Sequence, residues 1–292
     1  MLVRTWPLHG GVSAQTIAFE AELPYGKRRK FVLRRHGQVD RLQNPHVAAD
    51  EFHLLEALRS AGMAVPEPVL FDESGNIFPT PYIVLSFVEG ETITAPADLE
   101  GYMQQMAGFL AELHAVEISR VGLSHLRRAD QKVSAALAKP PAELDAELQE
   151  GRIRAALSAV WPLENRNGAV LLHGDYWPGN ILWRENRIAS VIDWEDAAVG
   201  DPLADMANAR LEILWAHGRE VMQRFTQYYL ATTHVDATHL PYWDLYTALR
   251  PIAGMASWGL DEDVLRRMVV RHKRFTEDAL QRIRDIRPAP DH

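Results

Sequence analysis

The stretch from Val170 to Asp205 constrains this chain most, because polar residues follow short apolar runs there at close intervals. The first apolar run, residues 169–172, leads into His173-Gly174-Asp175, and a loop that contains proline and glycine then closes at Asn180. Apolar runs this short, bounded by turn residues, are typical of β-strands rather than helices. We therefore predict a strand that delivers a polar loop.

Two more strands are predicted after this loop, at residues 181–183 and 188–192, joined by a polar turn. The second strand ends at Asp193. If the two strands pair as a hairpin, Asn180 and Asp193 lie close together, with Asp175 just upstream on the same rim. The sequence thus predicts a cluster of one amide and two carboxylates.

Such a cluster suits phosphoryl transfer. Mg²⁺ prefers one or two carboxylates together with the phosphates of a substrate, so Asn180 and Asp193 are candidate metal ligands. Asp175 is then left to accept the proton of an attacking hydroxyl. A surface loop with ordinary Asx turns is the alternative interpretation.

The spacing also matches a known pattern. Protein kinases carry H-R-D-x-x-x-x-N and a later D-F-G, and this chain reads H-G-D-x-x-x-x-N and then I-D-W. The ordered set resembles the aminoglycoside phosphotransferase and choline kinase-like family of small-molecule kinases. The matching positions are His173, Asp175, Asn180, Asp193, Gly200, Asp201, Pro202 and Asp205.

The resemblance implies an α+β, bilobal protein-kinase-like fold. We expect a small N-lobe, residues 1–89, with an antiparallel sheet and one helix. A larger, mainly helical C-lobe, residues 90–292, would carry the catalytic loop 173–180 and the segment around Asp193. A chain of 292 residues is long enough for two such lobes.

Composition limits the partners. The formal net charge of −8 argues against nucleic acid and is compatible with a cationic substrate. The absence of cysteine excludes thiol catalysis and thiolate metal sites. Residues 1–7 lack a signal-peptide pattern and no apolar run reaches about 18 residues, so we expect a soluble, cytoplasmic protein with no membrane partner.

A turn near the N-terminus is a candidate phosphate-binding loop. Residues 9–13 contain Gly11 and Ser13 between predicted strands, and backbone N–H groups of such turns bind phosphates. The family resembled places its nucleotide-covering loop here. An ordinary hairpin turn is the alternative.

The next predicted strand, residues 30–34, occupies the place of the kinase V-A-I-K segment. Arg34 would then supply the cation for the α- and β-phosphates of ATP or GTP, and Glu51 on the following helix would be its ion-pair partner. Arg35 is the alternative if the register differs by one residue, although alternation would point its side chain to the other face of the strand. For Glu51, the alternative is a carboxylate that faces solvent.

A hinge follows the strands predicted at 69–71 and 81–88. In the kinase pattern, the backbone from Ser86 to Val88 hydrogen-bonds the adenine, so these residues are candidate cofactor-binding positions. The lobe boundary is expected near Glu89-Gly90.

Most of the remaining chain is predicted to be helical. Asp201 is a good N-cap and Pro202 a good first residue for one helix. In the family resembled, Asp205 braces the catalytic loop through its backbone, so His173, Asp201 and Asp205 are expected to support the site rather than react. The helices are predicted at residues 48–61, 98–117, 142–150, 203–217, 219–232, 242–254 and 262–286.

Residues beside the loop are candidates for acceptor binding. Trp177 and Trp194 flank the loop and are predicted to line the acceptor pocket. Glu195 and Asp196 would hold a substrate cation, with solvated loop carboxylates as the alternative.

The predicted function is Mg²⁺-dependent transfer of the γ-phosphoryl group of ATP or GTP to a hydroxyl of a small molecule, such as an aminoglycoside or an amino alcohol. A nucleotide-binding pseudokinase scaffold and a metal-dependent phosphohydrolase using His173, Asp175 and Asp193 are the alternatives. A protein kinase is disfavoured, because no A-P-E element follows Asp193.

Overall fold

The computed structural model describes residues 1–8, 14–37, 42, 44–118 and 126–286. The chain forms two compact units, each with its own internal packing. The N-terminal unit comprises Met1–Ile93, Val116–His125 and Gly179–Glu195, and the C-terminal unit comprises Thr94–Ala115, Leu126–Pro178 and Asp196–His292. The hairpin that follows the catalytic loop therefore packs with the N-terminal part of the chain.

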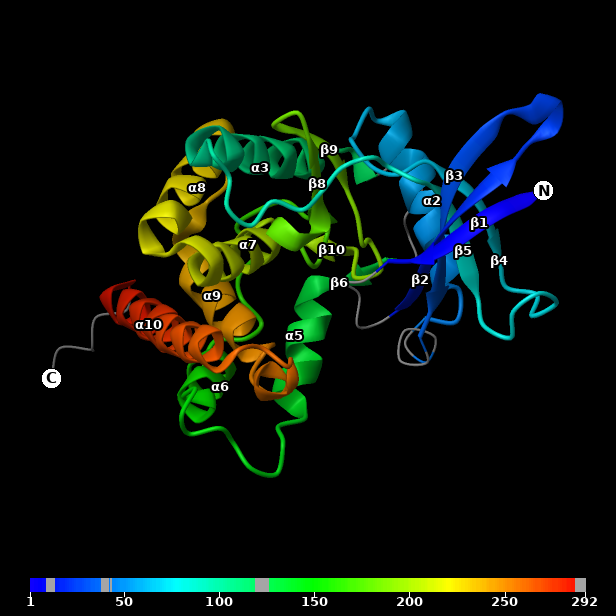
Figure 1. The fold of residues 1–292 in the computed structure, drawn as a ribbon. Helices are drawn as coiled ribbons and strands as arrows, with labels where there is room; N and C mark the ends of the chain where they lie inside the picture. Colours follow the sequence, from blue (N-terminus) through cyan, green and yellow to red (C-terminus); the bar gives the residue numbers. More distant parts are fainter. Residues whose placement is uncertain (9–13, 38–41, 43, 119–125, 287–292) are drawn as a thin grey trace, which may run out of the picture. The chain divides into compact units, whose positions relative to one another are not determined.

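The N-terminal unit is built on an antiparallel five-stranded sheet with the strand order β1-β2-β3-β5-β4 (Figure 1). The strands are β1 (Leu2–Pro7), β2 (Ala14–Glu22), β3 (Arg28–His36), β4 (Pro68–Asp72) and β5 (Tyr82–Ser86). Phe31, Tyr82 and Val84 form a buried cluster on the sheet. Helix α2 (Val47–Ser60) packs against β4 and β5 and buries Leu54, Leu55 and Leu58.

Strand β3 lies in the middle of this sheet, and its register decides which side chains face α2. Arg34 pairs with Thr16 of β2 and with Ile83 of β5. Because side chains alternate along a strand, Arg34 and His36 share one face and Arg35 occupies the other.

The predicted hairpin is confirmed. Strands β8 (Ile181–Arg184) and β9 (Arg187–Val191) pair antiparallel, and the two residues between them have positive φ, as a tight hairpin turn requires. The hairpin joins the rest of its unit through the backbone. The Val191 N–H donates to the Ala64 carbonyl at 2.8 Å, and Trp183 exchanges hydrogen bonds with Glu91.

The C-terminal unit is mainly helical and contains a small sheet with the strand order β6-β10-β7. The strands are β6 (Arg127–Arg128), β7 (Val170–Leu172) and β10 (Ala198–Gly200). The helices are α3 (Leu99–His114), α5 (Ala129–Ala138), α6 (Glu150–Ser158), α7 (Leu203–His217), α8 (Arg219–Thr232), α9 (Leu240–Leu249) and α10 (Glu262–Ile286). Helix α7 packs against α8, α9 and α10, and much of its surface is buried.

Two predicted helices are wrong in extent. Residues 142–149 form turns, because the Asp145 carboxylate accepts the Leu148 N–H at 2.7 Å and the Glu150 carboxylate accepts the Asp145 N–H at 2.9 Å. Side chains that bond nearby backbone groups in this way compete with helix formation. Helix α9 ends at Leu249 instead of residue 254. Arg250 keeps helical backbone angles, but Pro251 has no N–H to donate to the carbonyl four residues earlier.

The other long helices agree with the sequence pattern. Helices α7, α8 and α10 have the predicted bounds, and the Asp98 carboxylate caps α3 by accepting the Gly101 N–H at 2.9 Å. Of the helices that the structure describes, none combines the length and the apolar character that crossing a membrane requires.

Candidate active site

Arg34 is the centre of a buried charge cluster in the N-terminal unit. Its Nη1 donates to Glu51 Oε1 at 2.8 Å, and its Nη2 donates to Glu195 Oε2 at 2.6 Å and to Asp193 Oδ1. We call Arg34, Glu51, Asp193 and Glu195 the Arg34 cluster. The predicted ion pair between Arg34 and Glu51 is therefore present, and β3, α2 and the end of the β8–β9 hairpin each supply a member.

Burial shows why these groups must be paired. The side chains of Arg34 and Glu51 are 8% and 3% exposed, so the alternative of a solvent-facing Glu51 is wrong. Burial lowers the pKa of Arg34, but the carboxylates of Glu51, Asp193 and Glu195 more than offset it and raise that pKa above its ordinary value. Arg34 is therefore a permanent cation held among three carboxylates.

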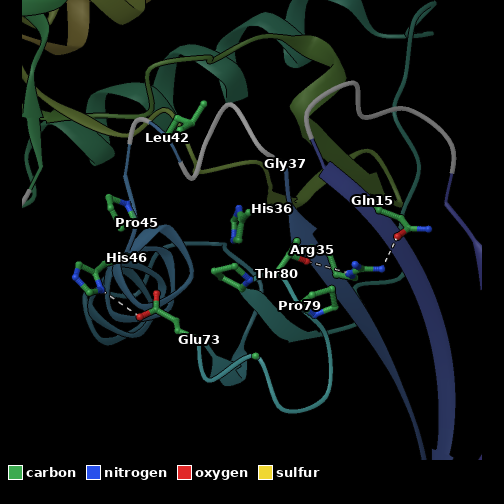
Figure 2. A pocket seen from close by; sticks show the side chains of 12 residues that line it. Gln15, Arg35, His36, Gly37, Leu42, Pro45, His46, Glu73, Pro79 and Thr80 are labelled. Atoms are coloured by element: carbon green, nitrogen blue, oxygen red, sulfur yellow. Dashed lines mark hydrogen bonds and ion pairs between the residues drawn. The ribbon is translucent and has the colours of Figure 1, made fainter.

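The alternative register, with Arg35 in place of Arg34, is excluded. Arg35 Nη1 donates to Gln15 Oε1 at 2.9 Å, and its Nε donates to Thr80 Oγ1 at 3.3 Å (Figure 2). Its guanidinium also lies over the Phe78 ring. These contacts are on the opposite face of β3 from Glu51.

Figure 2 also shows a pocket in the N-terminal unit, with a volume of about 760 Å³. His36, His46 and Glu73 line it, and none of the residues predicted for the functional site does. His46 Nδ1 lies 3.2 Å from Glu73 Oε2. His36 Nε2 also lies 3.4 Å from Glu51 Oε2, so the pocket adjoins the Arg34 cluster through His36.

Asn180 and Asp193 lie together at the open end of the β8–β9 hairpin. The Ile192 N–H donates to the Asn180 carbonyl at 2.9 Å, which places Asp193 directly beside Asn180. Asp193 adopts a left-handed conformation with φ of 69°, which is uncommon outside glycine and typical of functional turns. The two side chains offer hard oxygen donors beside a cation, a set that fits Mg²⁺ bound together with phosphates.

The predicted base, Asp175, lies on a turn of the C-terminal unit that we call the catalytic turn, residues 173–176. The Asp205 carboxylate holds this turn by accepting the His173 N–H at 2.7 Å and the Gly174 N–H at 2.8 Å. His173 Nδ1 accepts the Asp175 N–H at 3.2 Å. Asp205 and His173 thus have the bracing contacts that the resemblance implies.

Gly174 explains the middle position of the His-Gly-Asp motif. Its φ of 84° lies in the left-handed region, and a Cβ there would collide with the carbonyl oxygen of Asp196. A larger residue would therefore displace the turn that carries Asp175.

Asp205 is itself supported from two other helices. His114 Nε2 lies 3.4 Å from Asp205 Oδ2, and Tyr229 Oη lies 2.6 Å from His114 Nδ1. Burial raises the pKa of Asp205, but the bond to His114 and the nearby imidazole of His173 outweigh it and hold that pKa below its usual value. No role was predicted for His114, so sequence reasoning missed this support.

Sequence reasoning also missed a second brace of the catalytic turn. Arg250 Nη1 donates to the Gly174 carbonyl at 3.2 Å and to Asn208 Oδ1 at 2.9 Å, and Asn208 Nδ2 donates to the Tyr176 carbonyl at 3.3 Å. The residues on both sides of Asp175 are therefore held. Helical spacing could have indicated Asn208, because it lies three residues after Asp205 on α7.

Glu212, one turn further along α7, was missed as well. Burial and the nearby Asp175 carboxylate raise the pKa of Glu212 to about 8, although Arg250 opposes the shift. Positions 205, 208 and 212 share one helical face, so the same spacing could have indicated this residue. Glu212 is thus a carboxyl group that stays protonated near neutral pH beside the predicted base.

The helix that carries this face begins as predicted. Asp201 Oδ1 accepts the Leu203 N–H at 3.0 Å, as an N-cap does, and also accepts the Asn167 side-chain N–H at 3.0 Å. Burial raises the pKa of Asp201 above its ordinary value. These contacts give Asp201 a structural role.

Of the residues predicted to bind the nucleotide, Arg34 and Glu51 form the ion pair described above, Ser86 and Val88 can also be placed, and Gly11 and Ser13 lie outside the described residues. Ser86 ends β5, where its N–H donates to the Glu67 carbonyl at 2.8 Å and its hydroxyl donates to the Glu67 carboxylate at 2.8 Å. Val88 follows in the segment after the strand. Ser86 is therefore engaged within its own unit.

The residues predicted to contact the acceptor lie in different surroundings. Trp177 is partly exposed, whereas Trp194 is 2% exposed and its Nε1 donates to the Val191 carbonyl at 3.0 Å. Glu195 pairs with Arg34, and Asp196 pairs with Lys132 at 3.0 Å. Burial raises the pKa of Asp196, but the positive charges of Lys132 and Arg250 outweigh burial and hold that pKa below its ordinary value. Trp194, Glu195 and Asp196 thus each contact protein groups, and their predicted role in acceptor binding stays a prediction.

The chain is similar to proteins of two kinds. Acyl-CoA dehydrogenase family member 11 of Rattus norvegicus is 25% identical over 256 residues, which are 77% of this chain but 33% of that protein. The chain thus spans about a third of the length of that relative. Viomycin phosphotransferase of Streptomyces vinaceus is 27% identical over 239 residues, which are 74% of this chain and 76% of that protein.

The solved structures show the same fold. A thermostable mutant of aminoglycoside phosphotransferase APH(4)-Ia, in a ternary complex with ADP and hygromycin B, matches with a TM-score of 0.67 at 18% identity and covers 94% of each chain. The predicted α+β kinase-like fold, with an N-terminal antiparallel sheet and a helical C-terminal part, is thereby confirmed. The model of the phosphotransferase enzyme family matches residues 6–252. The chain therefore belongs to the phosphotransferase enzyme family.

Proposed function

We propose that this protein transfers the γ-phosphoryl group of ATP or GTP to a hydroxyl of a small molecule. The observation that carries the proposal is the Arg34 cluster. It joins a buried cation, the helix carboxylate that holds it, and the candidate metal ligand Asp193 in one hydrogen-bonded group. Phosphoryl transfer needs a fixed cation and a metal beside the phosphates, whereas a binding scaffold needs no such arrangement at Asp193.

Each residue has a role in this proposal. Arg34 binds the phosphates, and Asn180 and Asp193 hold Mg²⁺, which neutralises charge on the phosphates when bound. Asp175 orients the acceptor hydroxyl and accepts its proton, while Asp205 keeps the turn under Asp175 in place. His173 supports the turn through its ring nitrogen.

Hydrogen bonds within the N-terminal unit limit which backbone N–H groups of the predicted hinge can bind the nucleotide base. The N–H groups of Ser86 and Phe87 donate to carbonyls of their own unit, at 2.8 Å and 3.1 Å. We therefore assign adenine or guanine recognition to the backbone of Val88 rather than to Ser86.

Two classes of acceptor are candidates, and each is favoured by one kind of relative. The viomycin phosphotransferase relative favours a cationic antibiotic or amino alcohol. The acyl-CoA dehydrogenase family relatives favour a hydroxylated acyl thioester. Glu195 and Asp196 already pair with protein cations, so they add nothing to the case for a cationic acceptor.

The test is Mg²⁺-dependent release of ADP or GDP across a panel of hydroxylated acceptors. The panel contains viomycin, aminoglycosides, macrolides, choline, ethanolamine, simple sugars and hydroxyacyl-CoA thioesters. Stimulation by one acceptor that Asp175→Asn abolishes supports the proposal and identifies the substrate class.

Three outcomes contradict it. Nucleotide binding with no turnover indicates a pseudokinase scaffold. Acceptor-independent hydrolysis lost in Asp175→Asn indicates a phosphohydrolase, and phosphorylation of a generic protein such as casein indicates a protein kinase.

A further inference from the structure

Arg250 reaches the catalytic turn from the end of α9, a helix on which no functional residue was predicted. Its Nη1 serves both the Gly174 carbonyl, at 3.2 Å, and Asn208 Oδ1, at 2.9 Å. Because Asn208 in turn donates to the Tyr176 carbonyl, Arg250 and Asn208 act on the residues immediately before and after Asp175.

These contacts complement those of Asp205. Asp205 accepts N–H groups at the start of the turn, whereas Arg250 and Asn208 donate to its carbonyl groups. Rotation of the peptide unit between Gly174 and Asp175 breaks the hydrogen bond from Arg250, and displacement of the Tyr176 carbonyl breaks the one from Asn208. The orientation of the Asp175 side chain therefore depends on Arg250 as well as on Asp205.

The charges around the turn give Arg250 a second effect. The Asp196 carboxylate has Lys132 as its ion-pair partner at 3.0 Å, and Asp205 has His114 and two backbone N–H groups. Burial and Asp175 keep Glu212 protonated up to about pH 8, the value of its pKa. The Asp175 carboxylate and the Arg250 guanidinium interact electrostatically in this setting. The titratable and charged groups around the turn are His114, Lys132, His173, Asp175, Asp196, Asp205, Glu212, Tyr246 and Arg250.

We propose that Arg250 is a positioning residue for Asp175: with Asn208 it fixes the turn that carries Asp175, and its positive charge acts on the Asp175 carboxylate. The proposal deepens the phosphotransferase function above and rests on Asp175 acting there as the base. Asp175 and Glu212 then titrate as a coupled pair, whose two apparent pKa values both depend on Arg250.

The first experiment needs no acceptor. Protein labelled with ¹³C at the Asp and Glu side-chain carboxyl groups is titrated by NMR, and the signals of interest are assigned from their loss in Asp175→Asn and Glu212→Gln. Arg250→Met is expected to raise both apparent pKa values of the pair, because a nearby cation is lost. Arg250→Lys is expected to keep them close to those of the wild type, because the charge remains.

The second experiment measures turnover with the best acceptor from the panel. Arg250→Met is expected to lower kcat about 10- to 100-fold, since small displacements of a reacting group have effects of that size. Its KM for the nucleotide is expected to change less than about threefold, because the substitution removes no contact that binds the nucleotide equally in the ground state and the transition state. Arg250→Lys is expected to recover part of kcat, and only part, because an ammonium lacks the planar fork of a guanidinium.

Arg224→Met is the matched control. Arg224 is a surface arginine of α8 that pairs with Glu100 and Glu220 and does not contact the catalytic turn. Both the titration and kcat of this variant should equal those of the wild type.

The outcomes separate this proposal from the one on which it rests. A folded Arg250→Met variant with unchanged titration and unchanged kcat overturns the positioning role. If the wild type shows no turnover with any acceptor, the phosphotransferase proposal fails, while the NMR titration still decides whether Arg250 controls Asp175. If Arg250→Met does not fold, Arg250→Lys and Asn208→Ala carry both measurements, and unchanged kcat in both overturns the role.

Discussion

Two arginines of this protein lie among carboxylates, and their surroundings differ in kind. Arg34 is buried, and the hydrogen bonds described for its guanidinium end on the charged groups of Glu51, Asp193 and Glu195. Arg250 follows the last turn of α9, and its described hydrogen bonds end on neutral oxygens, a backbone carbonyl and an amide. The family resemblance implies a role in phosphoryl transfer for Arg34, and Arg250 holds the turn of the predicted base Asp175.

The difference shows two uses of the same side chain. A buried guanidinium must be neutralised, and the carboxylates of Glu51, Asp193 and Glu195 compensate the charge of Arg34. The direct hydrogen-bond partners of Arg250 are uncharged, so its positive charge acts on the nearby carboxylates of Asp175, Asp196 and Asp205. The comparison predicts that Arg34 matters most for stability and nucleotide binding, and Arg250 for the ionisation and placement of the base.

The largest expected effect is a loss of kcat, which should distinguish the catalytic turn from the Arg34 cluster. Asp175→Asn should lower kcat by about 10²- to 10⁴-fold, the usual range for loss of a general base. Its KM for the nucleotide should stay within about threefold of the wild type, because the proposed role of Asp175 is to act on the acceptor hydroxyl and not to bind the nucleotide. Asp193→Asn should instead raise the nucleotide KM and the Mg²⁺ concentration needed for half-maximal rate. Steady-state kinetics at varied nucleotide and Mg²⁺ check this, and equal changes in nucleotide KM for both variants contradict the division of roles.

The next effect concerns stability. Arg34→Met should destabilise the protein by about 3–5 kcal/mol, because Glu51 is left buried without its cation. The double variant Arg34→Met, Glu51→Met should recover most of that loss, since both buried charges are then removed. Arg250→Met should change stability far less. Urea unfolding of the variants measures these differences, and equal destabilisation by Arg34→Met and Arg250→Met would contradict the comparison.

A smaller effect tests Glu212 through pH. Its pKa in the folded protein is about 8, above its ordinary value of 4.5, so the folded state binds more protons between these two pH values. The stability that the protonated group contributes is therefore fully present below about pH 4.5 and is lost as pH rises towards 8. Glu212→Gln has no such titration, and its stability advantage over the wild type should grow across this window to the order of a few kcal/mol.

The measurement is the free energy of urea unfolding from pH 5 to pH 9. Glu212→Asp serves as a titrating control that keeps the charge. A difference between wild type and Glu212→Gln that stays constant over this range refutes the raised pKa. Asp175→Asn should also narrow the difference, since Asp175 raises the pKa of Glu212.

The smallest expected effect is that of Arg224→Met. Arg224 pairs with Glu100 and Glu220 at the surface, where solvent and salt screen the charges. We expect no measurable change in unfolding free energy or in kcat. A clear loss in either would show that surface ion pairs matter as much here as the ion pairs and hydrogen bonds of Arg34 and Arg250.

Sequence patterns predicted the elements that local rules control. The strands around Asn180 and Asp193, the N-cap at Asp201 and helices α7, α8 and α10 follow from short apolar runs, turn residues and helical periodicity. The patterns failed at residues 142–149 and beyond Leu249, where side-chain caps and Pro251 end the helical pattern. Both failures come from local chemistry that the apolar periodicity does not record.

The site was predicted where its residues are close in the chain or carried by a motif, and it was incomplete elsewhere. Asp175, Asn180, Asp193 and Asp205 lie within one stretch of sequence, so their spacing alone indicated a shared task. Glu195 and Asp196 were adjacent in sequence and predicted to act alike, yet one pairs with Arg34 and the other with Lys132. Sequence adjacency does not determine which unit a side chain joins.

The sequence by itself determined the family, the fold class and the order of the predicted reacting groups, because these depend on short-range spacing and on hydrophobic periodicity. The tertiary structure alone decided that Arg34 rather than Arg35 meets Glu51, since strand register sets which face of β3 each side chain occupies. It alone brought Arg250 and His114 to the catalytic turn and its brace, 76 residues from Gly174 and 91 residues from Asp205. Contacts over such separations arise from the packing of α7 against its neighbouring helices, and no local pattern of residues encodes them.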